Sequence, residues 1–262
     1  MAASTTTALA KKKSAALSVL NDMFAEDAGA GLSELGSEDL AIPFLKPLQK
    51  MSPELDSLEG AKAGDIYNTV TKEIVKGSEG VRVINCAYQL SFIEWMPRGS
   101  GSGAPANIYS SADQIPATER GDDNKDYVVD GGGRYLERTA QHYVLIVDKD
   151  GMTQQALLPM KSTQFKKSKQ WNSAMRSLKI KAPNGKMFLP PRYAYIWKLE
   201  TVPEENKNGS WHGWQISKES QIEDPDLYQE AKLFAESIHS GKVKVKHEQE
   251  QEDESTKDEV PF

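Results

Sequence analysis

One acid-free stretch of this 262-residue chain, from Met160 to Leu199, combines positive charge with aromatic rings. Its basic residues are Lys161, Lys166, Lys167, Lys169, Arg176, Lys179, Lys181, Lys186, Arg192 and Lys198. The stretch therefore carries ten positive charges, although the formal net charge of the chain is −6. Positive side chains at this density neutralise phosphates and release their counterions. The charge pattern predicts contact with a nucleic acid.

Aromatic residues in and before the stretch narrow the type of nucleic acid. Phe165, Trp171, Phe188, Tyr193, Tyr195 and Trp197 lie among the basic residues. Flat rings give unpaired bases a surface on which to stack, so single-stranded DNA is the expected ligand. The candidate DNA-binding rings are Tyr193, Tyr195, Trp197 and Trp95, with Arg98 beside the last. If the first three face the core, as rings at alternate strand positions usually do, then Trp95, Arg98 and the lysines would contact the DNA.

The end of the chain carries a second charge signal, of the opposite sign. Residues 248–262 contain seven acids and one base, Lys257, a net charge of −6, so that residues 1–247 sum to zero. An acidic segment without hydrophobic periodicity is not expected to fold. The apolar residues at its end predict insertion into a pocket of a partner protein, with the acids steering the segment to a basic rim.

Hydrophobic alternation predicts the strands. In Val81–Trp95 the apolar residues Ile84, Cys86, Tyr88, Leu90 and Phe92 recur with a period of two. The change of phase after Phe92 predicts either a bulge or a strand that leaves the sheet. Residues 142–147 and 152–158 are predicted to pair around a turn at 148–151, and 192–202 and 211–216 to be the last two strands. A helix is expected from Ser162 or Thr163 to Leu178, with Trp171 on its inner side.

This order of elements is that of the OB-fold, a five-stranded Greek-key barrel with a helix between strands 3 and 4. The expected fold is therefore mainly β. Its two binding loops would be residues 97–133, without clear structure of their own, and the polar residues 203–209. Two short strands around 64–67 and 73–75 are expected to lead into the barrel.

The predicted domain organisation follows from composition. Residues 1–40 form a flexible N-terminal region with a short helix at 14–25, and residues 41–220 form the OB-fold-like nucleic-acid-binding domain. Residues 221–241 hold a C-terminal helix, with Leu227, Ala231, Phe234 and Ile238 on one side. Residues 242–262 are the disordered acidic tail.

Composition also limits cofactors and location. The single cysteine, Cys86, cannot form an intrachain disulfide, which indicates a reducing interior such as the cytoplasm of a host cell. The scattered histidines give no metal-ligand spacing, so no metal and no other cofactor is expected. No apolar run reaches membrane-spanning length. The acid-free first twenty residues leave a transit peptide as an alternative.

The last five residues, Asp258, Glu259, Val260, Pro261 and Phe262, resemble the acidic tip of bacterial single-stranded-DNA-binding proteins, with Val260 where that tip usually has Ile. A barrel followed by an acidic tail with terminal Phe is also similar to the single-stranded-DNA-binding proteins of tailed phages. The resemblance implies a non-catalytic protein that coats and protects single-stranded DNA without sequence preference during phage replication, recombination and repair. It further implies that the tail recruits replication proteins, such as a polymerase, a helicase-primase or recombination factors, and competes with DNA for the basic groove. The sequence leaves open whether the protein forms a homodimer.

Two alternatives belong to other classes of function. A nuclease would use Asp148, Asp150 and neighbouring acids with Mg²⁺, although an Asp-x-Asp-Gly sequence is more often a turn. A virion or scaffold protein would use the same charges to contact other proteins.

Overall fold

The computed structural model describes residues 19–31, 41–97, 99–100, 103–111, 113–207, 209–243 and 245. The chain divides into two compact units, Met1–Leu40 and Ala41–Phe262. In the first unit, residues 19–26 are helical, with Met23 and Phe24 exposed. This helix overlaps the one expected at 14–25, of which residues 14–18 lie outside the described residues.

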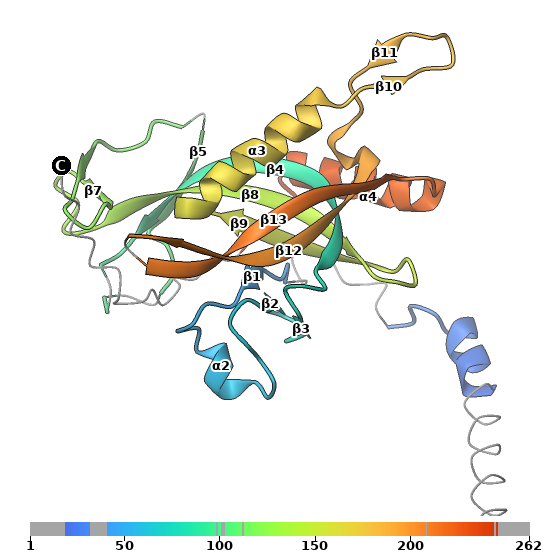
Figure 1. Ribbon diagram of the computed structural model, residues 1–262, viewed down its shortest axis with the longest axis horizontal. Coiled ribbons are helices and arrows are strands. Elements are labelled where there is room, and N and C mark those ends of the chain that lie inside the picture. The colour runs from blue at the N-terminus through green and yellow to red at the C-terminus, as the bar shows by residue number, and fades with distance from the viewer. Residues whose placement is uncertain are drawn as a thin grey trace, which may run out of the picture. The chain divides into compact units, whose positions relative to one another are not determined.

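The second unit is built on an antiparallel sheet with the strand order β13-β12-β4-β8-β7-β6, in which β5 also pairs with β4 and β9 with β8. Its long strands curl into a half-barrel (Figure 1), so the expectation of a mainly β protein is confirmed. The strands are β4 (Val81–Trp95), β5 (Asn107–Ser110), β6 (Thr118–Arg120), β7 (Asp126–Val128), β8 (Tyr135–Val147), β9 (Thr153–Met160), β12 (Tyr195–Asn206) and β13 (Gly209–Gln221).

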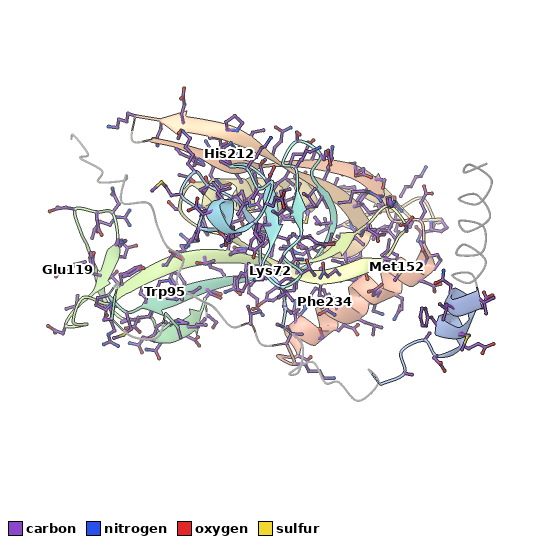
Figure 2. All side chains as sticks on the ribbon, turned by 90° about the horizontal axis from the view of Figure 1, so that it is seen from below. Lys72, Trp95, Glu119, Met152, His212 and Phe234 are labelled. Carbon is purple, nitrogen blue, oxygen red and sulfur yellow. The ribbon has the colours of Figure 1, made fainter. Side chains whose placement is uncertain are left out.

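Helices cover both faces of the sheet (Figure 1). On one face, Trp171 and Met175 of α3 (Phe165–Ser177) pack with Val83, Val144 and other strand residues. On the other face, Phe234 of α4 (Pro225–His239) packs on Ile84 and Leu145, and Figure 2 shows this ring on its helix. Both predicted helices are confirmed, with small shifts of their ends.

Smaller elements surround the sheet. A separate three-stranded sheet precedes β4 in the chain. Leu45 and Ile66 of this small sheet join the core on the α3 side. The strands predicted near 64–67 and 73–75 are present as two of its strands, and the strand predicted from 192 begins only after a short 3-10 helix. These elements are β1 (Leu45–Pro47), α2 (Glu54–Ser57), β2 (Ile66–Asn68), β3 (Ile74–Val75), η2 (Ser162–Gln164), β10 (Ile180–Lys181), β11 (Met187–Phe188) and η3 (Arg192–Ala194).

The bulge in β4 lies earlier than predicted. The register against β8 shifts between Asn85 and Ala87, not after Phe92. Cys86 is buried as expected, but Asn85 and Ala87 on the predicted polar face are buried too. The cause is the second covering layer, because a sheet packed on both sides buries both sets of alternating residues.

The connection 97–133, predicted to lack clear structure, contains β5, β6 and β7 and is held to the sheet by a buried carboxylate. Glu94 is 1% exposed. It forms an ion pair with Arg134 at 3.0 Å and accepts hydrogen bonds from the side chains of Asn107 at 2.7 Å and Tyr109 at 2.8 Å. A charge buried at this depth is stable only because all three partners converge on it.

The second expected loop, 203–209, is also different in the structure. Strands β12 and β13 stay paired as far as Asn206 and Gly209, so most of this segment is a hairpin. The polar character of residues 203–209 predicted a loop, and Pro203 lies at its start. A proline has no backbone N–H to donate. It fits here because β12 pairs with β4 only through residues 196–199, so β4 needs no donor from β12 at position 203.

A buried polar network attaches α3 to the sheet. Nδ1 of His142 in β8 accepts a hydrogen bond from the side-chain amide of Asn85 at 2.9 Å, which leaves the ring proton on Nε2, 2.8 Å from the Ser168 hydroxyl in α3. The imidazole also stacks on Trp171, with 4.8 Å between ring centroids. The Arg192 guanidinium completes the network by donating to Asn85 at 3.3 Å and to Asn172 at 2.9 Å.

The buried imidazole makes stability depend on pH. Burial, with the neighbouring Arg192 charge, lowers the pKa of His142 from 6.5 to about 3. Between these values the unfolded chain binds a proton that the folded chain does not, so stability falls as pH falls, by up to about 1.4 kcal/mol per pH unit. Urea unfolding should show a loss of about 1.6 kcal/mol from pH 6.5 to pH 5, and much less in His142→Gln. His239→Gln, which removes an exposed histidine, should behave as wild type; an unchanged pH dependence in His142→Gln would contradict this account.

Removing the charge of Glu94 should loosen the connection without unfolding the sheet. In Glu94→Gln the Arg134 guanidinium loses its ion pair, and amide hydrogen exchange across residues 103–111 and 118–128 should rise about tenfold or more. Glu119→Gln, an exposed change on β6 at the same end of the molecule (Figure 2), is the control. Equal exchange in the two variants would show that Glu94 does not hold this segment.

Candidate nucleic-acid interface

The structure brings six of the ten predicted basic residues onto one continuous part of the chain. We call them the basic face: the exposed residues on α3 and on the hairpin that follows it, Lys166, Lys169, Arg176, Lys179, Lys181 and Lys186. Within the described part of the chain, none of these six forms an ion pair. Their charges are therefore available to an external anion.

The other four basic residues are engaged within the protein. Lys161 pairs with Glu137 at 3.2 Å, Lys167 with Glu204 at 2.6 Å, and Lys198 with Glu200 at 2.9 Å. Arg192 is part of the His142 network and lies over the Tyr88 ring. The stretch lacks acids in sequence, but β8 and β12 bring acids to it in space.

The β10–β11 hairpin projects from the end of α3, away from the sheet (Figure 1). Its turn places Gly185 at a φ of +80°, which glycine adopts without strain. Met187, Phe188 and Leu189 are 56%, 43% and 57% exposed, next to Lys186. The hairpin thus presents an accessible aromatic ring among unpaired positive charges.

All four predicted stacking rings lie elsewhere. Trp95 and Trp197 are 4% and 3% exposed and belong to the core. For Trp197, the sequence analysis had named a core position as the alternative to contact with DNA. Tyr193 and Tyr195 are half-buried, the first against Tyr228. The structure brings none of these four rings to the basic face. Arg98 and the tail residues 258–262 lie outside the described residues.

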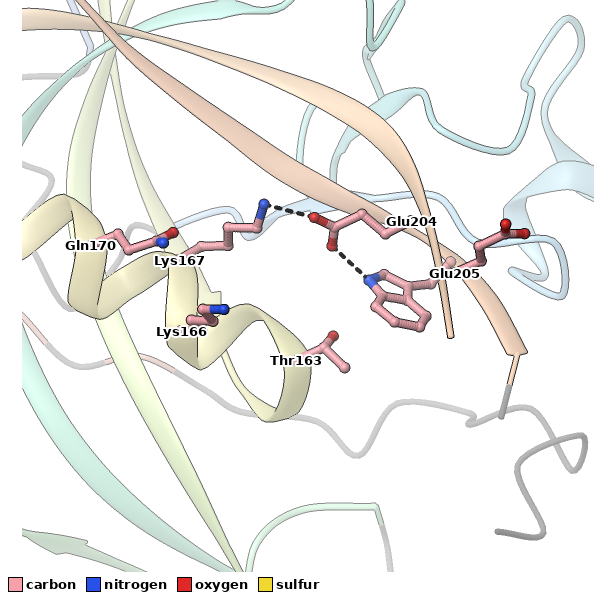
Figure 3. A pocket seen from close by; sticks show the side chains of 7 residues that line it. Thr163, Lys166, Lys167, Gln170, Glu204 and Glu205 are labelled. Atoms are coloured by element: carbon pink, nitrogen blue, oxygen red, sulfur yellow. Dashed lines mark hydrogen bonds and ion pairs between the residues drawn. The ribbon is translucent and has the colours of Figure 1, made fainter. Parts of the chain in front are cut away.

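A pocket of about 400 Å³ lies between the first turns of α3 and the end of the β12–β13 hairpin. Figure 3 shows the Glu204 carboxylate at its centre, where one oxygen accepts from Lys167 at 2.6 Å and the other from the Trp211 indole at 2.9 Å. The pocket is lined by Thr163, Lys166, Lys167, Gln170, Glu204, Glu205 and Trp211.

Electrostatics keep Glu204 ionised. Burial alone would raise the pKa of Glu204, but the hydrogen bonds from Lys167 and Trp211, together with the positive charges of Lys167 and Lys166, lower it below its usual value. The carboxylate is therefore a permanent anion at neutral pH, in contact with a cation of the predicted DNA-binding set.

Trp211 was missed by the sequence analysis, although a signal was present. Residues 211 and 214 of one strand lie on opposite faces, so only one of the two tryptophans can face the core. Trp214 is 1% exposed and fills the core, whereas Trp211 is half-buried and lines the pocket. The other three tryptophans of the chain are buried as well.

A second hollow, of about 290 Å³, shares Lys167 and Gln170 with the first. Trp171 and Trp197 line it, and their indole N–H groups have no hydrogen-bond partner among the residues that the structure describes. The two hollows follow the same side of α3.

One acid of the alternative nuclease site, Asp148, stabilises the turn between β8 and β9. The Asp148 carboxylate accepts hydrogen bonds from the backbone N–H groups of Asp150 and Met152, both at 2.8 Å. In the described ranges, no three His, Cys, Asp or Glu side chains gather as a metal site would require. Of the helices in those ranges, none is long and apolar enough to cross a membrane.

The chain was compared with families of known proteins. The model of a family described as Pam3 phage gp34-like protein matches residues 10–244, well over half of the chain. No curated protein and no solved structure matches. By the extent of the family match, the chain belongs to the Pam3 phage gp34-like family.

Proposed function

We propose that this protein binds and protects single-stranded DNA without sequence preference during phage DNA replication and recombination. The basic face and the β10–β11 hairpin would contact the strand, with phosphates on the lysines and bases on Phe188. The protein acts in this proposal as a coat rather than as an enzyme.

The observation that carries the proposal is the unpaired state of the basic face. Charged protein surfaces normally mix both signs. Here the acids of neighbouring strands form ion pairs with Lys161, Lys167 and Lys198, but within the described residues they form none with the six residues of the basic face. A polyanion is the ligand that such a surface attracts most strongly.

The strand pairing supports an OB-like arrangement. In the order β9-β8-β4-β12-β13, each neighbouring pair is antiparallel, and α3 lies between β9 and β12 in sequence. This is the element order predicted for the barrel. Among the strand pairings of the described residues, none joins β9 to β13, so the proposed relation is to an open form of the fold.

The acidic tail would recruit replication proteins through Phe262 and compete with DNA for the basic face. Its support is the sequence itself, in which residues 248–262 carry −6 while residues 242–247 and the basic face are positive. Opposite charges on one chain interact most strongly at low salt.

Binding should depend steeply on salt, and the hairpin should account for part of the slope. Replacing Lys179, Lys181 and Lys186 with Gln should weaken binding to oligo-dT and reduce the slope of log K against log salt by about 2, since each phosphate contact on a single strand contributes about 0.7. The control replaces three exposed lysines on other elements, Lys62, Lys76 and Lys149, and should leave the slope nearly unchanged. Equal slopes in both triple variants would remove the hairpin from the interface.

Removing residues 248–262 should tighten binding of oligo-dT, about tenfold at low salt and less as salt rises, because the internal competitor is lost. A second variant, with the seven acids changed to their amides and Phe262 kept, should show the same gain if charge is the cause. Unchanged affinity of both variants at low salt would show that the tail does not act on the basic face.

A further inference from the structure

We propose that the pocket between α3 and the β12–β13 hairpin is a subsite for one nucleotide of the bound strand, and that Glu204 occupies the place of that nucleotide's phosphate in the free protein. This inference rests on the proposed function and adds a defined site and an internal competitor to it.

The donors around Glu204 are those that recognise a phosphate. The Lys167 ammonium and the Trp211 indole N–H both point at one anionic group, at 2.6 and 2.9 Å. A phosphate oxygen accepts charge-assisted hydrogen bonds from the same kinds of donor as a carboxylate oxygen. Lys166, which lines the pocket without an ion pair in the described residues, would add a second positive charge.

The remaining lining suits the base and the sugar. Trp211 is the one tryptophan of the five that is not buried, and its ring forms part of the wall. The Thr163 hydroxyl and the Gln170 amide can each donate and accept hydrogen bonds, so they could contact a nucleotide with any base. The pocket volume of about 400 Å³ lies within the range of about 300–1,000 Å³ of small-molecule sites.

Competition by Glu204 would make the subsite selective. A ligand that offers only phosphate must break the Lys167–Glu204 and Trp211–Glu204 contacts and gains little by replacing them. A nucleotide with an unpaired base gains stacking on Trp211 in addition. The subsite therefore favours single strands over duplex, in which the bases are not available.

Glu205 provides a matched control. It lines the same pocket and carries the same charge one residue further along, but its side chain points away from Lys167 (Figure 3) and forms no ion pair within the described residues. Long-range repulsion of DNA is the same for both acids, whereas direct competition is possible only for Glu204.

The test measures the affinity of the full-length protein for oligo-dT at low salt. Glu204→Gln, which keeps the shape and an acceptor for Trp211, should tighten binding about tenfold, because a charge-assisted bond to Lys167 no longer has to be broken. Glu205→Gln should tighten it by less than about threefold, since an exposed charge is screened. Equal effects of the two substitutions would overturn the inference.

Tryptophan fluorescence gives an independent reading of the same site. Oligo-dT should quench the wild-type emission, and Trp211→Phe should lose most of this quenching because the other four tryptophans are buried. Unchanged quenching in Trp211→Phe would also overturn the inference. If wild type binds no oligo-dT at all, the proposed function itself fails; if it binds with the predicted salt dependence but Glu204 and Trp211 have no special effect, only the subsite fails.

Discussion

The attachment of α3 to the sheet is the interaction on which the rest of the interface depends. Ser168, Trp171 and Met175 are buried along one side of this helix, and His142 contacts the first two. Because these contacts determine the rotation of the helix about its axis, they also determine that Lys166, Lys169 and Arg176 face solvent. The direction of the β10–β11 hairpin is set by the same helix, because the hairpin follows directly after α3 in the chain. A neutral, stacked imidazole at this point makes the orientation of the basic residues a property of the core.

Charge in sequence and charge in space differ in this protein. Lys161 and Glu137 are 24 residues apart in the chain, yet strand pairing brings them into contact. The basic residues of the acid-free segment are thus divided into those that form ion pairs with acids of neighbouring strands and those that form none among the described residues. The exposed members of the second group lie on α3 and the projecting hairpin. The charge pattern predicted a DNA-binding surface, and the topology decides which of the ten basic residues stay exposed as candidates for it.

The strands and helices could be predicted from local patterns, since period two and period 3.6 are set by each segment itself. The burial of both faces of β4 could not, because it depends on two covering layers, α3 on one face and α4 on the other. The order in 97–133 depends on Glu94, a charged residue that composition assigns to the surface, and on partners up to 40 residues away. Trp211 was missed for a related reason: its role follows from which of two tryptophans the core accepts.

The two parts of the interface would act at different distances. At about 0.1 M salt, charges attract over roughly 10 Å, so the unpaired hairpin, which projects from the sheet, would meet a strand before the pocket does. The pocket would bind a strand only on direct contact, because Lys167 is already paired with Glu204. In this proposal the hairpin would attract the strand, and the pocket would then exchange Glu204 for a phosphate of the strand. Attraction and recognition would thus be separate steps. A protein that must coat any single strand, yet leave duplex free, needs these two steps to be carried by different residues.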